Sequence, residues 1–274
     1  MEFASLEPLE GGWSGETFLA DAGGDRTVVR VFGDPRHSPH AAEIQAALLR
    51  LVRGLLPVPR VLEVRRADPA TGLPALLVTE FLPGVRGDQL LPTLDDDGLR
   101  RAGAAVGRIV GTLGGMPFLE RGAFGDGDLT VEPFELELPA SLGEVAPAAE
   151  ALLDEETRTC LVHSDLNPTN LLLDPDTLEV TGLLDWEFAH AGHPFTDLGN
   201  VLRFDREPAY VDAVLAAYAE LRDTPPGRAR ELARAADLYA LVGLASRAGQ
   251  NPVATRAAAR LEAIVAAGDV HATE

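Results

Sequence analysis

The sequence contains no lysine, and this absence excludes several enzyme classes. Its 274 residues include 23 basic side chains, and all of them are arginine. A Walker A phosphate loop, a Schiff-base lysine and the Ser-x-x-Lys acyl-enzyme motif each require a lysine. Enzymes of these three classes are therefore excluded.

Cysteines and long apolar stretches are scarce as well. The single cysteine, Cys160, cannot form a disulfide within the chain, which suits a reducing compartment. No apolar run approaches the ~18–20 residues of a membrane-spanning helix. The first residues show neither the basic nor the apolar segment of a secretory signal. We therefore expect a cytoplasmic protein without a membrane partner.

The net charge of −20 is distributed unevenly along the chain. Residues 1–86 carry 11 acidic residues and 9 arginines, whereas residues 87–274 carry 32 acidic residues and 14 arginines. No basic stripe is present that could neutralise the phosphates of a nucleic acid, so we expect no nucleic-acid partner. The acidic second part favours a cationic partner, although the same acids could simply keep the surface solvated.

The pattern of apolar residues predicts an α+β protein with two lobes. Strand-like segments dominate residues 1–82, interrupted by one helix from Ser38, as N-cap, to about Arg53. Helical spacing dominates after the Leu82-Pro83-Gly84 segment. We predict a small β-rich N-terminal lobe, residues 1–82, a hinge at 80–86, and a larger, mostly helical C-terminal lobe, residues 83–274. The strands are expected at 3–9, 17–20, 27–32, 61–66 and 75–81, and the later helices at 99–113, 148–158, 208–222, 226–248 and 253–267.

Two short segments carry the chemistry. Residues 163–170 read H-x-D-x-x-x-x-N, and residues 185–187 read D-x-E. Each segment follows a short apolar strand, so Asp165, Asn170 and Asp185 can point into one cleft. Asp165 is expected to accept or orient the proton of an acceptor hydroxyl. Asn170 and Asp185 supply the oxygen ligands that magnesium prefers beside substrate phosphates. Phosphoryl transfer needs these parts because its transition state is rich in charge.

The neighbours of this motif are expected to support it. His163, Ser164 and Asp165 are consecutive, so they point to alternate sides and cannot relay a proton. We interpret His163 as a residue that braces the loop. Asp197 is expected to do the same by accepting hydrogen bonds from backbone N–H groups. Glu187 either supports the metal site or faces the acceptor, and the sequence leaves this choice open.

A glycine-rich segment at residues 11–15 is a candidate for the donor phosphates. It lies between two expected strands, and backbone amides at Gly12, Ser14 and Gly15 could approach phosphate oxygens. Arg30 in the following strand would reach the α and β phosphates, and Glu43 on the helix would pair with Arg30. The alternative is a plain hairpin turn, an arginine at a sheet edge and a solvated acidic residue.

At these residues the chain resembles the aminoglycoside phosphotransferase family, whose kinase-like fold is shared with choline kinases and protein kinases. The resemblance runs in order from the glycine segment to residues 183–202. It implies the catalytic role for Asp165, a metal site at Asn170 and Asp185, and a phosphate contact for Arg30. It also implies an adenine site at the backbone of the hinge residues Glu80, Phe81 and Leu82.

One position departs from the usual pattern of kinase-like enzymes. Arg30 stands where many of them have lysine, and arginine binds phosphate oxygens in a different, bidentate geometry. We expect ATP as the donor, with GTP as the alternative, and Mg²⁺ as the metal. A protein kinase is disfavoured because Ser164, not arginine, precedes Asp165 and no Ala-Pro-Glu segment is present.

The acceptors of the family are diverse and include aminoglycosides, basic cyclic peptides such as viomycin and capreomycin, choline, sugars and homoserine. Aromatic residues are only 5% of the chain, which disfavours the aromatic cage that a quaternary ammonium requires. We therefore expect phosphorylation of a hydroxyl on a small, cationic, antibiotic-like molecule. The alternatives are a metabolic kinase for a sugar, an amino alcohol or homoserine, and a non-catalytic module that binds a nucleotide or a drug.

Overall fold

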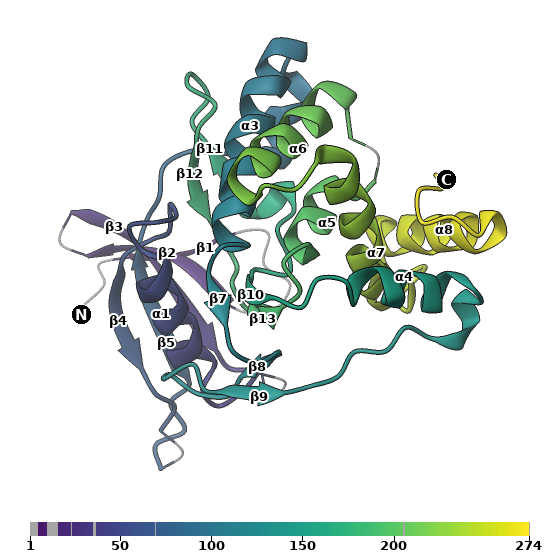
Figure 1. Cartoon of the computed structure of the whole chain (residues 1–274). Helices are drawn as coiled ribbons and strands as arrows, with labels where there is room; N and C mark the ends of the chain where they lie inside the picture. The colour runs from purple at the N-terminus through teal and green to yellow at the C-terminus, as the bar shows by residue number, and fades with distance from the viewer. Residues whose placement is uncertain are drawn as a thin grey trace.

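A five-stranded antiparallel sheet forms the N-terminal part of the fold (Figure 1). The structure is a computed structural model that describes residues 5–9, 16–22, 24–34, 37–68, 70–204 and 206–273. The strand order is β1-β2-β3-β5-β4, so neighbours in sequence pair except at the β3–β5 crossover. The sheet comprises β1 (Ser5–Pro8), β2 (Glu16–Ala22), β3 (Asp25–Phe32), β4 (Val61–Arg65) and β5 (Ala75–Glu80).

Helix α1 (Ala41–Val52) packs against β4 and β5 of this sheet. Its buried side chains join the same apolar cluster as Phe32 and Leu77 of the sheet. The helix begins later than the sequence predicted, because Ser38 is not its N-cap. Instead the Ser38 hydroxyl accepts a hydrogen bond from the backbone N–H of His40, and this local turn precedes the helix.

The chain leaves the first sheet directly after β5. Strand β6 (Val85–Arg86) pairs with β11 (Leu171–Leu173), which in turn pairs with β12 (Val180–Leu183) in a separate three-stranded sheet. Gly84 makes this crossing with a φ of +142°, and a Cβ there would lie 2.5 Å from the hydroxyl oxygen of Thr181. The predicted lobe boundary at residue 82 and the predicted hinge at 80–86 lie at this crossing. Both remain predictions.

Two long helices pack unusually closely in the second part of the molecule. Helix α3 (Asp96–Leu113) lies against α6 (Pro208–Arg222), side by side in Figure 1. Gly103 and Gly107 stand four residues apart on the contact face of α3. A Cβ at these positions would lie 2.5 Å from the Tyr210 carbonyl oxygen and 2.4 Å from that of Val214. Glycine at both positions therefore lets the two backbones approach each other.

The remaining elements surround the segments that carry the motifs. A third sheet has the order β7-β10-β13-β8-β9. The helix predicted at 148–158 forms earlier, as α4 (Val145–Leu153), and helix α5 was not predicted. The bounds are α2 (Gly87–Leu90), β7 (Pro117–Phe118), β8 (Gly122–Phe124), β9 (Val131–Pro133), β10 (Thr159–Val162), β13 (His190–Gly192), α5 (Thr196–Leu202), α7 (Pro226–Ala245) and α8 (Pro252–Ala267), with short 3-10 helices at Leu91–Thr93, Ala140–Leu142 and Pro168–Asn170.

One apolar core runs through most of the molecule. It extends from Phe32 and Leu77 in the first sheet to Val106 and Tyr218 between α3 and α6. A smaller cluster with Val29 and Val78 covers the other face of the first sheet. In the part of the chain that the structure describes, no helix is both long and apolar enough to pass through a lipid bilayer. The predicted α+β class, with β structure first and helices later, is confirmed.

Candidate active site

The loop between β10 and β11 places Asp165 beside Asn170. The Asp165 carboxylate accepts hydrogen bonds from the side-chain amides of Asn167 and Asn170, each at 2.8 Å. Asn167 also caps the 3-10 turn Pro168–Asn170, because its side-chain oxygen accepts from the backbone N–H of Thr169 at 2.9 Å. This single turn explains the spacing of the motif, since it folds Asn170 back onto Asp165.

The amide of Asn170 has a defined orientation. Its nitrogen donates to both the backbone carbonyl and the carboxylate of Asp165, at 2.9 and 2.8 Å. A carbonyl or carboxylate oxygen can only accept, so the network assigns the nitrogen to this side. The amide oxygen of Asn170 takes no part in these two hydrogen bonds.

Asp197 at the start of α5 braces this loop. Its two carboxylate oxygens accept hydrogen bonds from the backbone N–H groups of His163 and Ser164, both at 2.8 Å. Ser164 adopts a left-handed φ of 67°, a conformation that costs energy without such support. Burial raises the pKa of Asp197 to about 6, against the opposing effect of the two N–H donors. The structure thus shows the backbone contacts that the sequence analysis expects of Asp197.

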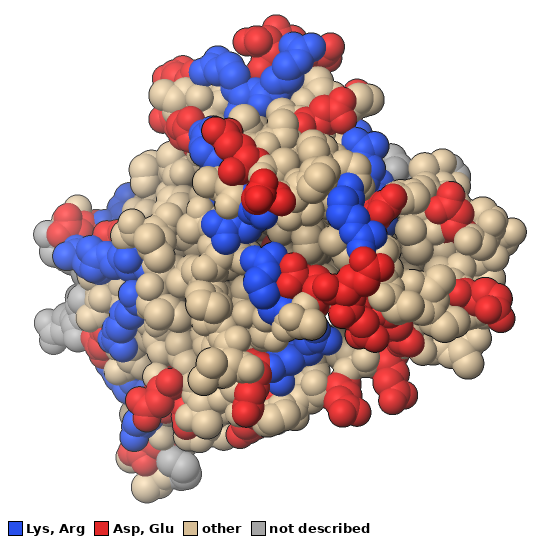
Figure 2. All heavy atoms as spheres, in the orientation of Figure 1, with Lys and Arg blue, Asp and Glu red and all other residues tan. Residues whose placement is uncertain are grey.

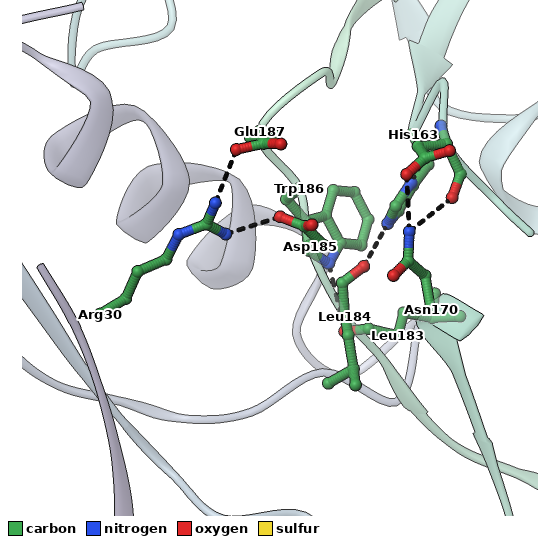
Figure 3. Close-up of polar contacts among 9 residues, drawn as sticks. Arg30, His163, Asn170, Leu183, Leu184, Asp185, Trp186 and Glu187 are labelled. Atoms are coloured by element: carbon green, nitrogen blue, oxygen red, sulfur yellow. Dashed lines mark hydrogen bonds and ion pairs between the residues drawn. The ribbon is translucent and has the colours of Figure 1, made fainter. Parts of the chain in front are cut away.

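His163 links the two motif segments. One ring nitrogen, Nε2, lies 2.8 Å from the Leu184 carbonyl, and the other, Nδ1, accepts from the Asp165 backbone N–H at 3.3 Å. The ring also packs against Trp186, with 4.7 Å between ring centroids (Figure 3). Burial lowers the pKa of His163 to about 4, so the ring is neutral at pH 7 with its proton on Nε2. It holds the segments together and does not relay protons.

Arg30 reaches from the first sheet to the D-x-E segment. Its guanidinium lies 2.6 Å from Asp185 Oδ1 and 2.6 Å from Glu187 Oε2, through Nη1 and Nη2 respectively (Figure 3). Asp185 has a φ of 61°, so its backbone is held in the left-handed region at this point. The arginine that we expect at the donor phosphates therefore stands directly beside the expected metal ligand.

The prediction that Glu43 pairs with Arg30 is wrong. Both residues are described, and the structure shows no ion pair between them. The Glu43 carboxylate instead accepts from Nε of Arg66 at 2.7 Å and lies 3.4 Å from Nδ1 of His40. A loop also packs on this residue, since a Cβ at Gly127 would lie 3.1 Å from the Glu43 Cβ. Glu43 faces β4 and this loop, while Arg30 extends toward residues 185–187.

The pKa of Asp165 is raised above its ordinary value. Burial is the main cause, and the nearby negative charge of Asp185 adds to it. The hydrogen bonds from Asn167 and Asn170 and the positive charge of Arg203 act in the opposite direction. A carboxylate with a raised pKa is a better proton acceptor, as a residue that takes a hydroxyl proton needs to be.

The expected hinge residues follow β5. The Phe81 N–H donates to the Arg26 carbonyl at 3.3 Å, and the Arg26 guanidinium lies 3.9 Å from the centre of the Phe81 ring. The Glu80 carboxylate accepts from the backbone N–H of Arg60 at 2.9 Å. Leu82 packs toward Gly182, whose Cβ position would be 3.0 Å from it. Adenine binding at the hinge backbone stays a prediction.

Gly12, Ser14 and Gly15 of the glycine-rich segment lie outside the described residues, so their role stays a prediction. The strands on either side, β1 and β2, pair antiparallel with Pro8 opposite Phe18. The segment therefore connects two neighbouring strands, as the sequence indicated.

Two functional candidates were missed by the sequence analysis. Asn167 contacts the Asp165 carboxylate and was given no role, although asparagine directly before Pro168 is a recognisable helix-capping pattern. Arg203 at the end of α5 acts on Asp165 through its charge, and no local sequence signal indicates this.

The donor set fits a cation that uses few protein ligands. Among the described residues, no group of three or more histidine, cysteine or acidic side chains could hold a metal ion. The oxygens of Asn170 and Asp185 remain, and magnesium is commonly bound by one or two such ligands together with phosphates and water.

Comparison with known proteins places the chain among phosphotransferases. It is 32% identical to streptomycin 3''-kinase of Streptomyces griseus over 189 residues, 60% of this chain and 65% of that protein. Aminoglycoside 3'-phosphotransferase of Streptomyces ribosidificus is 30% identical, over 61% of this chain and 69% of its own. A match to mouse acyl-CoA dehydrogenase family member 10, at 29% identity, spans 59% of this chain but only 16% of the mouse protein.

Solved structures show the same fold at low identity. Aminoglycoside phosphotransferase APH(4)-Ia superposes with a TM-score of 0.67 at 20% identity, over 97% of this chain and 95% of that one. A microcompartment-associated aminopropanol kinase gives 0.64 at 21% identity, over 97% and 94%. The family model described as the phosphotransferase enzyme family matches residues 5–238. The chain belongs to the phosphotransferase enzyme family, and its fold is the kinase-like fold.

Proposed function

We propose that the chain is a kinase that uses ATP and magnesium to phosphorylate a hydroxyl of a small, cationic, aminoglycoside-like molecule. The observation that carries this proposal is the meeting of three groups from distant segments. Asn170 donates to the Asp165 carboxylate at 2.8 Å. His163, in the same loop, lies 2.8 Å from the carbonyl of Leu184, the residue before Asp185. Arg30 reaches Asp185 from the first sheet at 2.6 Å. Family membership supports the same reaction type.

Asp165 is the residue that would take or orient the proton of the acceptor hydroxyl. Its raised pKa and its two amide donors fix both its basicity and its direction. The hydrogen bonds from Asn167 and Asn170 and the charge of Arg203 favour its ionised form against the effect of burial, which raises the pKa. The rest of the loop serves to hold this carboxylate in place.

Asn170 and Asp185 would hold magnesium through one amide oxygen and one carboxylate. A bound magnesium ion neutralises charge on the phosphate oxygens. Arg30 would bind phosphate oxygens with the guanidinium that now contacts Asp185 and Glu187. Glu187 would then keep Arg30 in reach when Asp185 turns to the cation. ATP is the proposed donor, and GTP is the alternative to be tested beside it.

The charge of the second part of the chain supports a cationic acceptor. Figure 2 shows acidic side chains gathered at the centre and right of this face, over the half of the molecule that carries α4 and α8. Residues 120–156 alone hold 11 acidic residues against one arginine. Two relatives are named for streptomycin and aminoglycosides. The structural neighbour named as an aminopropanol kinase makes a metabolic amino alcohol kinase the second candidate.

The test is an ADP-release assay with a panel of hydroxylated cationic compounds, comparing the wild-type protein with Asp165→Ala. We expect the substitution to lower kcat by about 10²–10⁴-fold, the usual contribution of a general base. Asp174→Ala is the matched control, because Asp174 lies in a turn after β11 and only holds local backbone groups. Activity of Asp165→Ala within tenfold of wild type would show that Asp165 does not have this role.

The cationic acceptor is tested separately by ionic strength. Surface charges are screened over about 8–10 Å at physiological salt. We therefore expect kcat/KM for the acceptor to fall as salt rises, while the KM for the nucleotide changes less. Salt-independent kinetics with a neutral acceptor would favour the metabolic alternative.

A further inference from the structure

A pocket lies outside the candidate active site. It encloses about 280 Å³ and is lined by residues of α5, α6 and α7 and by Arg206, which lies between α5 and α6. Its lining includes the arginines 206, 230 and 234, the carboxylate of Asp212 and the apolar side chains of Leu202 and Val211. None of the residues proposed for catalysis, metal or nucleotide lines it.

The lining is basic in a chain whose net charge is −20. The described residues that line it include three arginines and one carboxylate, and Arg234 is engaged in a further contact. Arg230 and Arg234 stand four residues apart on α7, so they project from the same face of the helix. Arg230 pairs with Asp212 at 3.0 Å in a contact that is largely exposed to solvent. Such exposed pairs are weak and can be exchanged for a competing anion.

Arg206 is the distinctive member of this lining. Its Nε donates to the Val201 carbonyl at 2.8 Å, and no described carboxylate forms an ion pair with it. Burial lowers the pKa of Arg206 and the charges of Arg203 and Arg256 lower it further, whereas Tyr210 and Asp237 act in the opposite direction. A half-buried cation repelled by two others is stabilised when an anion binds beside it.

The other arginines at this junction are already engaged. Arg203 donates twice to Asp237 through Nε and again through Nη2, and both side chains are buried. Arg256 lies over the Phe204 ring at 4.8 Å and donates to the Phe204 carbonyl at 3.2 Å. Phe204 itself has a φ of 63°, an uncommon conformation for an aromatic residue.

We infer that this arginine-lined pocket, named here the α5–α7 pocket, binds a small organic phosphate. Guanidinium groups bind phosphate oxygens through paired, charge-assisted hydrogen bonds. The volume of about 280 Å³ lies near the lower end of ligand pockets, which begin at about 300 Å³. Leu202 and Val211 give the pocket an apolar side, which favours a phosphate ester over inorganic phosphate.

The test is calorimetric titration of the whole chain with phenyl phosphate and with inorganic phosphate. A non-hydrolysable ATP analogue with magnesium is kept saturating, to occupy the candidate active site. We expect phenyl phosphate to bind more tightly than inorganic phosphate. Arg206→Gln should weaken phenyl phosphate binding by about tenfold or more, as expected for a lost hydrogen bond to a charged group.

Matched variants keep the inference open to refutation. Arg230→Gln, at the solvent-exposed edge, should weaken binding several-fold and decides the matter if Arg206→Gln does not fold. Arg30→Gln and the surface variant Arg100→Gln on α3 should leave it unchanged, since neither residue lines the pocket. Absence of binding at millimolar concentration, or binding lost in Arg30→Gln and kept in Arg206→Gln and Arg230→Gln, would overturn the inference.

Discussion

The two sides of the candidate active site are held in place by different kinds of contact. Around Asp165, buried side chains bind backbone groups: Asp197 accepts from two N–H groups, and His163 contacts the Leu184 carbonyl. Around Arg30, the described contacts are ion pairs between side chains that lie 155 and 157 residues apart. The contacts around Asp165 involve backbone groups, whose positions the fold determines. The contacts around Arg30 join only the ends of side chains.

This difference determines which side can change during a reaction. Breaking a bond to a buried backbone group leaves that group unsatisfied, which costs about 1–3 kcal/mol. A guanidinium can exchange a carboxylate for a phosphate oxygen with little loss, because both are charged acceptors of similar geometry. We therefore expect the Asp165 side to stay fixed and the Arg30 side to rearrange when a nucleotide binds.

The largest effect that would sharpen this comparison is expected from Asp197→Ala. The change leaves two backbone N–H groups without their acceptor, so the free energy of unfolding should fall by about 1–3 kcal/mol. The loop with Asp165 should also lose its position, so kcat should fall at least about tenfold. Chemical denaturation and the ADP-release assay measure the two effects.

The control is Asp197→Asn, which keeps one acceptor oxygen and should recover part of the loss. The pH dependence adds a check of sign. Because the folded pKa of Asp197 is about 6, above its ordinary value of 3.8, its contribution to stability falls as pH rises from about 4 through 6. Both variants should lack this slope. A variant as stable and as active as wild type would show that the brace is dispensable.

An intermediate effect is expected from Arg30→Gln. All three side chains of the ion pairs to Asp185 and Glu187 are mostly buried, so removing the guanidinium leaves two carboxylates without this partner and the melting temperature should fall as well. The KM for ATP should rise by about tenfold, which corresponds to one lost charge-assisted contact of ~1.4 kcal/mol.

Glu43→Gln is the matched variant for Arg30→Gln. Since Glu43 contacts Arg66 and His40 instead of Arg30, we expect its KM for ATP to stay within about twofold of wild type, as for a weak surface ion pair. Equal damage from both variants would mean that Arg30 and Glu43 pair in the reacting enzyme.

The smallest effect expected is a shift of the pH profile in Asn167→Ala. Asp165 has to be ionised to accept a proton, so kcat/KM should fall as pH drops through its pKa. The hydrogen bond from Asn167 lowers that pKa, and its removal should move the acidic limb to higher pH. Thr169→Val keeps the Asn167–Asp165 contact and should leave the limb in place. If the acidic side of the kcat/KM profile does not shift in Asn167→Ala, it reports the titration of a group other than Asp165.

Much of the fold could be predicted because its signals are local. The strands of the first sheet and the helices at 208–222 and 226–248 follow from apolar spacing within each segment. The contacts among His163, Asp165 and Asn170 follow from a seven-residue spacing and one helical turn. The predicted start of helix α1 was wrong because it depended on a hydrogen bond. The Ser38 hydroxyl supports a turn instead of capping the helix.

By itself the sequence determined the class of fold, the family and the spacing that brings Asp165 and Asn170 together, since these depend on residues close in the chain. Only the tertiary structure decided that Arg30 meets Asp185 and Glu187 while Glu43 turns to Arg66. It alone also gathered arginines from α7 and from the segment between α5 and α6 around one pocket. The reason is physical: a long charged side chain has many possible partners, and only the packing of distant elements determines which one lies within reach.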